Sequence, residues 1–351
     1  MVFSVSKYAY LNARIRARLS RFLTPHDIER LINSANIDEA YNVLRQTSYA
    51  PLFAKVDSSV PLPEVESLVF TNEVYHYIEI MRDAYGNIQE VIRAMLRYFE
   101  IENLKQILRV WHNKRSFDKS RFLFRGKIVD DLPVDKLLKA ENFEEIILYL
   151  DGTPYKNALI RSRESFKRSN NLFYIEVSLD VQYYIELWDK LSRLSSSDRK
   201  IARRLIGIEI DIKNINWMVR FRFYHKIPMG EALSLLIPNG YRVSEEFVKR
   251  AYLNDNMRSV IEGLLTQYYL KIPSMSLTEE DLINLQALEA ILWRFLFNEI
   301  TRCLSGYPFS IGVLLAYLTL RKIDTQNIIS VLNGKLYGIS PAELSTNLVV
   351  R

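Results

Sequence analysis

The chain has 351 residues, of which 48% are apolar and 25% charged, and its formal net charge is +6. These proportions are typical of a folded globular protein and exclude a disordered or fibrous one, while the length suits two or three domains. With 11 glycines and 11 prolines, the chain has too few turn residues for a many-stranded β protein, so we expect an all-α fold.

The charge and the cysteine content narrow the class of protein only a little. A surplus of 47 Lys and Arg over 41 Asp and Glu is compatible with nucleic acid, anionic lipid headgroups or an acidic protein partner. The single cysteine, Cys303, excludes an internal disulfide framework and fits a reducing compartment. The N-terminal stretch meets arginines early and lacks the apolar run of a secretory signal, so we expect a protein that stays inside the cell.

The first predicted helix combines basic and apolar side chains. Its basic residues are Lys7, Arg14, Arg16, Arg18 and Arg21. These charges could contact phosphates, or they could form the solvated face of an amphipathic helix whose other side packs on the core. The second arrangement is the more common one.

Four helix starts are marked by a capping Ser or Thr followed three positions later by an acid. The pairs are Thr24 with Asp27, Ser195 with Asp198, Ser276 with Glu279, and Ser340 with Glu343. Between these marks apolar residues recur at helical spacing, for example over residues 65–78 and 285–295, which predicts long amphipathic helices.

The most membrane-like segment covers residues 303–320, which are uncharged and lie between Arg302 and Arg321. Gly306 and Pro308 interrupt its first half. The apolar helix that remains is too short to cross a hydrocarbon core of roughly 30 Å. We therefore expect a buried core helix here.

A ten-residue frame occurs three times, as EIENLKQILR at 100–109, DIKNINWMVR at 211–220 and DTQNIISVLN at 324–333. Each copy begins with an acid and has Asn at position four, and the first two copies end in Arg. The candidate site residues of this frame are Glu100, Asn103, Arg109, Asp211, Asn214, Arg220, Asp324 and Asn327.

A second mark, Thr-x-Tyr, precedes each frame in the chain. Its copies are Thr47 with Tyr49, Thr153 with Tyr155, and Thr266 with Tyr268. The Thr-x-Tyr motif and the ten-residue frame thus recur three times in the same order. This recurrence predicts an internal triplication, with helical domains at residues 1–117, 118–228 and 229–351. Pro228, near the second boundary, should end a helix. Three such bundles can form an open row or close around an axis.

Two geometries of the acid and Asn are compatible with their spacing. Three residues apart in a helix, both side chains lie on one face. Alternatively the acid caps a helix start, as the third copy favours, because its apolar helix should end near Arg321. In the simplest interpretation both residues satisfy backbone donors at a bend between helices, and they could also face a partner.

No pattern of residues predicts catalysis, a metal or a cofactor. His26, His76, His112 and His225 are far apart, and one cysteine cannot build a structural zinc site. The two Gly-Lys pairs, at 126–127 and 334–335, lack both the earlier glycine and the following Ser or Thr of a phosphate loop. We expect a protein that is not an enzyme and binds no nucleotide.

Several stretches, taken in order, resemble the central-stalk coupling subunit of rotary A-type and V-type ATPases, which is the C subunit of prokaryotic complexes and the d subunit of eukaryotic ones. The first is YAYLNARIRA at 8–17. The others lie at 99–104, 209–215, 308–312, 316–318 and 333–335. The resemblance therefore spans essentially the whole chain.

This resemblance implies three similar helical bundles arranged as a funnel with a central socket. It also implies a non-catalytic rotor subunit that links the central shaft to the membrane rotor ring and transmits torque between ATP hydrolysis or synthesis and proton or sodium transport. The implied partners are the shaft subunits and the ring, with no nucleic acid. The implied location is the cytoplasmic face of the membrane. A helical scaffold without a membrane partner and a basic nucleic-acid-binding protein remain as alternatives.

Overall fold

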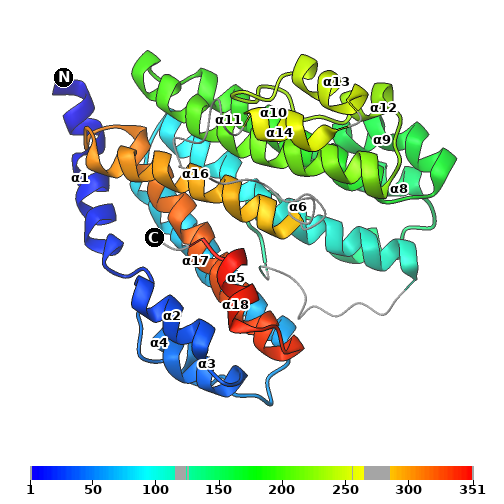
Figure 1. Cartoon of the computed structure of the whole chain (residues 1–351). Helices are drawn as coiled ribbons and strands as arrows, with labels where there is room; N and C mark the ends of the chain where they lie inside the picture. The colour runs from blue at the N-terminus through cyan, green and yellow to red at the C-terminus, as the bar shows by residue number, and fades with distance from the viewer. Residues whose placement is uncertain (1, 115–123, 125, 255, 265–284, 350–351) are drawn as a thin grey trace. The chain divides into compact units, whose positions relative to one another are not determined.

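The computed structural model describes residues 2–114, 124, 126–254, 256–264 and 285–349 (Figure 1). Within these ranges every regular element is a helix, which confirms the all-α prediction. The chain divides into two compact units: unit 1 comprises Met1–Ser58 with Ser195–Arg351, and unit 2 comprises Ser59–Leu194. This division describes packing rather than sequence duplication, so the three predicted repeat ranges stay a prediction.

Unit 2 is built around one long central helix, α6. Its described helices are α5 (Leu62–Asp83), α6 (Asn87–Asn113), α7 (Val134–Lys139), α8 (Phe143–Tyr149), α9 (Tyr155–Ser169) and α10 (Phe173–Ser192). Helix α6 packs against α5, α7 and α10, and α10 packs in turn against α9. The contact faces are apolar, with Leu96 and Leu104 of α6 and Leu187 of α10 completely buried.

Unit 1 joins the two ends of the chain. Its described helices are α1 (Val2–Leu19), α2 (Pro25–Asn33), α3 (Ile37–Leu44), α4 (Ala50–Phe53), α11 (Ser196–Val219), the π-helical turn η2 (Arg220–Tyr224), α12 (Met229–Ser234), α13 (Glu245–Leu253), α14 (Met257–Leu264), α16 (Leu285–Ser305), α17 (Ile311–Tyr337) and α18 (Pro341–Asn347). Helix α17 contacts α1, α2, α3, α11, α16 and α18 and so occupies the centre of this unit. Figure 1 shows α17 running beside α16.

Helix α17 begins with the apolar segment that the sequence marked. Residues 311–318 are all buried, which confirms the predicted core helix. The helix is buried around most of its circumference because neighbouring helices of unit 1 surround it. Among the residues that the structure describes, no helix combines the length and the apolar character needed to cross a membrane.

The predicted helix starts agree with the structure wherever it describes them. Thr24 and Asp27 form a reciprocal capping box at α2. Ser195 caps α11, and Ser340 caps α18. Ser276 and Glu279 lie outside the described residues. Pro228 precedes α12, after η2 has ended at Tyr224, so the predicted helix break is also confirmed.

Candidate functional site

Glu100 lies in the middle of α6 with 2% of its surface exposed. One carboxylate oxygen, Oε2, accepts hydrogen bonds from the backbone N–H groups of Val129 and Asp130, both at 2.9 Å. The other, Oε1, accepts one from the hydroxyl of Tyr155 at 2.5 Å. Burial raises the pKa of Glu100, although these three donors oppose the increase. The residue thus fastens the loop before α7, and the start of α9, to α6.

Asp211 makes the corresponding contacts in the middle of α11. Its two carboxylate oxygens accept from the backbone N–H groups of Arg242 at 2.7 Å and Val243 at 3.0 Å. These residues lie in the loop that leads into α13. Gly240 packs against the same carboxylate, and a Cβ there would also lie 2.9 Å from the carbonyl oxygen of Val243. Only glycine therefore fits at this point of the loop.

Asp324 repeats the arrangement in α17, but its partners come from the other end of the chain. Its Oδ2 accepts from the backbone N–H of Leu23 at 3.1 Å and from the hydroxyl of Tyr49 at 3.3 Å. Arg321 donates to the same hydroxyl at 3.2 Å and stacks 4.4 Å from the ring centre of Phe22. Burial, with the nearby Asp324 carboxylate, raises the pKa of Tyr49 well above its ordinary value, so the hydroxyl stays protonated and donates.

The three Asn residues hold the backbone of a neighbouring segment. Asn214 donates to the carbonyl of Ile237 at 2.8 Å and accepts from its N–H at 3.0 Å. Asn327 makes the same pair of bonds to Val349, at 2.8 and 3.2 Å. Asn103 donates to the carbonyl of Phe124 at 2.8 Å. Each partner lies 21 to 23 residues after its Asn, so each amide anchors the chain soon after its long helix ends.

The interpretation of the acid as a helix cap is wrong. Asp324 lies inside the continuous helix α17, which runs on past Arg321 to Tyr337. The acid and the Asn therefore share one helical face, the other arrangement that the spacing allows. Most of their partners are backbone groups, as expected, but these belong to segments packed against the helix rather than to a bend in it.

The last residue of the frame and the Thr-x-Tyr motif have different surroundings in different copies. Arg109 forms a two-pronged ion pair with Glu176 of α10, at 2.7 and 2.8 Å. Arg220 is exposed at the start of η2. Tyr155 and Tyr49 bind acids of the frame, whereas Thr266 and Tyr268 lie outside the described residues. The structure thus brings each acid together with its own loop and does not gather the eight residues into one site.

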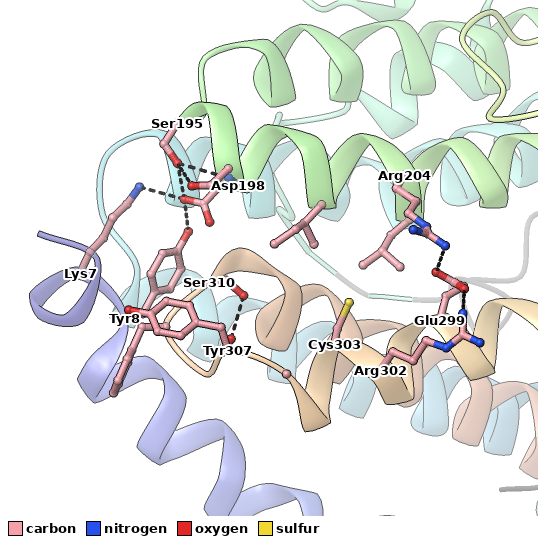
Figure 2. A pocket seen from close by; sticks show the side chains of 15 residues that line it. Lys7, Tyr8, Ser195, Asp198, Arg204, Glu299, Arg302, Cys303, Tyr307 and Ser310 are labelled. Atoms are coloured by element: carbon pink, nitrogen blue, oxygen red, sulfur yellow. Dashed lines mark hydrogen bonds and ion pairs between the residues drawn. The ribbon is translucent and has the colours of Figure 1, made fainter. Parts of the chain in front are cut away.

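A separate pocket of about 750 Å³ lies in unit 1 between α1, α11 and the end of α16 (Figure 2). Lys7, Tyr8 and Asp198 lie at one end of it, and Arg204 and Glu299 at the other (Figure 2). Its remaining lining residues are Ser195, Ser197, Ile201, Leu205, Arg302, Cys303, Gly306, Tyr307, Phe309 and Ser310.

Asp198 joins three helices at one end of this pocket. Its Oδ2 accepts from the hydroxyls of Tyr8 and Ser195, both at 2.9 Å, and its Oδ1 accepts from the backbone N–H of Ile311 at 3.0 Å. Burial, followed by the charge of Asp198, raises the pKa of Tyr8. Among the described lining residues no histidine accompanies Ser195, and the serine is engaged in capping α11. Asp198 thus connects α1, α11 and the start of α17.

Glu299 organises the opposite end of the pocket. Its side chain is 5% exposed, and its carboxylate binds Arg302 at 2.6 Å and Arg204 at 2.8 Å. Both arginine side chains are far more exposed than the Glu299 side chain between them. In the part of the chain that the structure describes, no group of His, Cys, Asp and Glu side chains is arranged to hold a metal ion.

Three important polar contacts could not be predicted from the sequence. Lys322 of α17 binds Glu209 of α11 at 2.5 Å, and its ammonium lies 5.2 Å from the ring centre of Trp293. The sequence pattern predicted Asp198 only as the acid of a capping pair, and it did not indicate the hydrogen bonds from Tyr8 and Ile311. None of these contacts leaves a local signal in the sequence, because the partners are 113 to 190 residues apart.

One arginine of the basic first helix, α1, ties this helix to another part of unit 1. Arg16 donates to the carbonyl of Leu304 at 2.9 Å. On its apolar side Tyr8, Leu11 and Ile15 are almost completely buried. The structure therefore agrees with an amphipathic helix that packs on the core.

These features define an all-helical protein in which buried acids and amides on long helices fasten the neighbouring loops. The chain belongs to the ATP synthase (C/AC39) subunit family, whose family model matches residues 11–346. The family that the motifs suggested is thereby confirmed.

Curated relatives support the same family over nearly their whole length. The C subunit of the A-type ATP synthase of Methanocaldococcus jannaschii is 23% identical, covering 99% of this chain and 88% of the relative. The C subunit of Methanosarcina acetivorans is 27% identical, covering 98% and 93%. The C subunit of Pyrococcus horikoshii is 25% identical, covering 93% and 86%.

Proposed function

We propose that this protein is a non-catalytic rotor subunit of an A-type ATP synthase. In this role it links the central shaft to the membrane rotor ring and transmits torque between ATP hydrolysis or synthesis and proton or sodium transport. The observation that carries the proposal is the match to the ATP synthase subunit family over residues 11–346. The relatives named as C subunits of A-type ATP synthases extend over nearly the full chain.

The internal construction of the units supports a role in force transmission. A part that transmits torque must resist deformation, and buried, fully hydrogen-bonded polar groups hold packed elements in one arrangement. Glu100, Asp211 and Asp324 each fasten a loop to a long helix. Lys322 and Glu209 join two of the long helices, α17 and α11, directly.

We further propose that the chain is a triplication, with repeats at residues 1–117, 118–228 and 229–351, that forms a funnel with a central socket. The recurrence of one contact pattern supports the triplication. In all three long helices an acid binds backbone N–H groups, and an Asn three residues later binds a backbone carbonyl. A shared origin explains this recurrence better than three independent solutions.

The partners that this role requires are the shaft subunits and the rotor ring, on the cytoplasmic face of the membrane. A torque-bearing contact should bury at least roughly 1,000 Å² with each partner. The proposal includes neither nucleic acid nor direct nucleotide binding. The absence of a phosphate loop in the sequence supports the latter point.

Co-elution of the purified full-length protein with detergent-solubilised ring and with isolated shaft subunits tests the proposal. A complex containing both partners at once is the expected result. Binding to shaft alone would favour a scaffold without a membrane partner. Co-purified nucleic acid whose binding weakens steeply with salt, with no rotor component bound, would overturn the proposal.

A further inference from the structure

The pocket lined by α1, α11 and the α16–α17 connection exposes its cations and buries its acids. The side chains of Arg302 and Arg204 are 72% and 48% exposed, whereas Glu299 between them is 5% exposed. At the other end Lys7 is 29% exposed and Asp198 is 7% exposed. A molecule approaching from solvent therefore meets positive charge at both ends.

The buried acids are already saturated by contacts within the chain. Each oxygen of Glu299 binds one guanidinium, and both oxygens of Asp198 accept hydrogen bonds. They thus hold the cations in position and offer little to an incoming ligand. Because the guanidiniums are positioned in advance, a partner loses less conformational freedom on binding them.

Apolar groups form the floor between the two charged ends. Ile201 and Leu205 contribute from α11, and Cys303 and Phe309 from α16 and the following turn. Tyr307, at the pocket, is 51% exposed. A concave volume of about 750 Å³ is large enough for one or two inserted side chains, and Arg and Tyr are the residues enriched at the centres of protein interfaces.

We propose that this pocket docks an acidic segment of a protein partner, which inserts an apolar or aromatic side chain onto the floor. Carboxylates flanking that side chain bind Arg204 and Arg302 at one end and Lys7 at the other, and a guanidinium can hold a carboxylate through two parallel hydrogen bonds. The inference rests on the proposed function, since the partner is another component of the rotor.

A protein segment fits this pocket better than a membrane surface does. Recognition of anionic headgroups ordinarily uses a broad cluster of about four to eight Lys and Arg. The described lining of this pocket carries Lys7, Arg204 and Arg302, spread over two ends with an apolar recess between them. Such spacing matches a side chain flanked by carboxylates.

Cys303 provides a direct probe, because it is the single cysteine of the chain and lines the pocket. The experiment measures the rate at which a small neutral thiol reagent modifies the full-length protein, alone and with saturating shaft subunits or solubilised ring. We expect one of these partners to slow the modification about ten-fold or more. Vesicles containing anionic lipid, tested in parallel, should leave the rate unchanged.

A charge reversal at the rim tests the electrostatic part of the proposal. Arg302→Glu should weaken binding of the protecting partner at least ten-fold, because a carboxylate then faces the partner's acids. Arg163→Glu is the matched control: Arg163 is 41% exposed and also bound to a glutamate, Glu144, but lies in unit 2. It should bind as the wild type does.

The outcomes separate this inference from the proposed function. If both partners co-elute with the wild type but neither protects Cys303, the docking proposal is wrong and the rotor assignment stands. Protection by vesicles alone would identify a headgroup site and also overturn it. If neither partner co-elutes at all, both proposals fail together.

Discussion

Glu100, Asp211 and Asp324 each place a carboxylate inside a helical core, where an ionised group without partners would be strongly destabilising. Each acid instead accepts at least two hydrogen bonds, and most of the donors are backbone N–H groups of a packed loop. Those N–H groups would themselves lack partners without the acid. The acid and the loop therefore satisfy each other's hydrogen-bonding groups, and removing either one should destabilise the fold.

Asn214→Ala tests the amide of this arrangement. The change removes two hydrogen bonds and leaves both backbone groups of buried Ile237 without their partner. At roughly 1–3 kcal/mol for each unsatisfied buried group, we expect the free energy of unfolding to fall by about 2–4 kcal/mol. Urea denaturation followed by circular dichroism measures it.

Asn113→Ala is the control for this prediction. Asn113 is exposed and donates to the carbonyl of Arg109 within the same helix, so its loss should change the free energy of unfolding by about 0.5 kcal/mol or less. If both substitutions lowered the free energy of unfolding equally, Asn214 would not stabilise the fold through its hydrogen bonds to Ile237.

Glu100 makes a pH-dependent prediction. Because burial raises its pKa above the ordinary 4.5, the folded state binds this proton more tightly than the unfolded state. The contribution of Glu100 to the free energy of unfolding should therefore decrease as pH rises from about 4.5 through the raised pKa. Glu100→Gln cannot titrate, so the wild type should lose stability relative to this variant across that window.

Glu144 is the control, because its contribution to stability should change with pH in the opposite direction. The pKa of Glu144 is lowered, first by its hydrogen bond to Lys167 and then by Arg163. The stabilisation that this acid contributes is present above its ordinary pKa and is lost as pH falls through the lowered one. Relative to Glu144→Gln, the wild type should lose a small amount of stability towards acid. If the difference in the free energy of unfolding between the wild type and Glu100→Gln stayed the same at all pH values, the Glu100 prediction would be wrong.

At the scale of elements, a row of ion pairs joins α6 to α10. Arg97 binds Glu186 at 3.2 Å, and Arg109 binds Glu176 at 2.7 Å. Between them Lys105 binds Asp180 at 2.6 Å and also contacts Glu102 at 2.7 Å. Burial opposes the charge on Lys105, but the two carboxylates raise its pKa and keep it charged. The row fixes the register of two antiparallel helices at points along their length.

Lys105→Met tests this row. The substitution leaves Asp180, which is 14% exposed, without its counter-charge, and we expect a loss of about 3 kcal/mol in the free energy of unfolding. The double variant Lys105→Met with Asp180→Leu should recover more than half of this loss, since apolar side chains then meet. Chemical denaturation of both variants measures the difference.

An exposed pair provides the comparison. Arg193 and Asp189 are both more than half exposed, so Arg193→Met should cost about 0.5 kcal/mol or less. A Lys105→Met variant no less stable than this one would show that the buried pair does not hold α6 to α10.

At the scale of the whole molecule, Asp324 joins segments from opposite ends of the chain within unit 1, whereas Glu100 acts within unit 2. Asp324→Ala should therefore speed amide hydrogen exchange in α17 and α11 by at least ten-fold and leave α6 and α10 unchanged. Glu100→Ala should produce the reverse pattern. Mass spectrometry of peptides from the exchanged protein measures both; uniform acceleration throughout the chain would contradict independent compact units.

Much of the helical architecture could be predicted because its signals are local. Thr24, Ser195 and Ser340 cap the helices that they were expected to cap. The apolar run after Pro308 became the core helix α17. The prediction failed at Asp324, where an acid with capping chemistry lies in mid-helix. The preference of an acid for backbone N–H groups does not reveal whether those groups belong to its own helix or to a distant loop.

The sequence by itself determined the all-helical class, the helix starts and the recurrence of acid and Asn, because helical period and capping depend on residues within about one turn of one another. Only the tertiary structure decided what the recurring residues bind. Glu100 reaches residues 29 and 30 positions away, and Asp324 reaches one 301 positions away. Contacts over such separations depend on how the helices pack, which no local pattern of residues specifies.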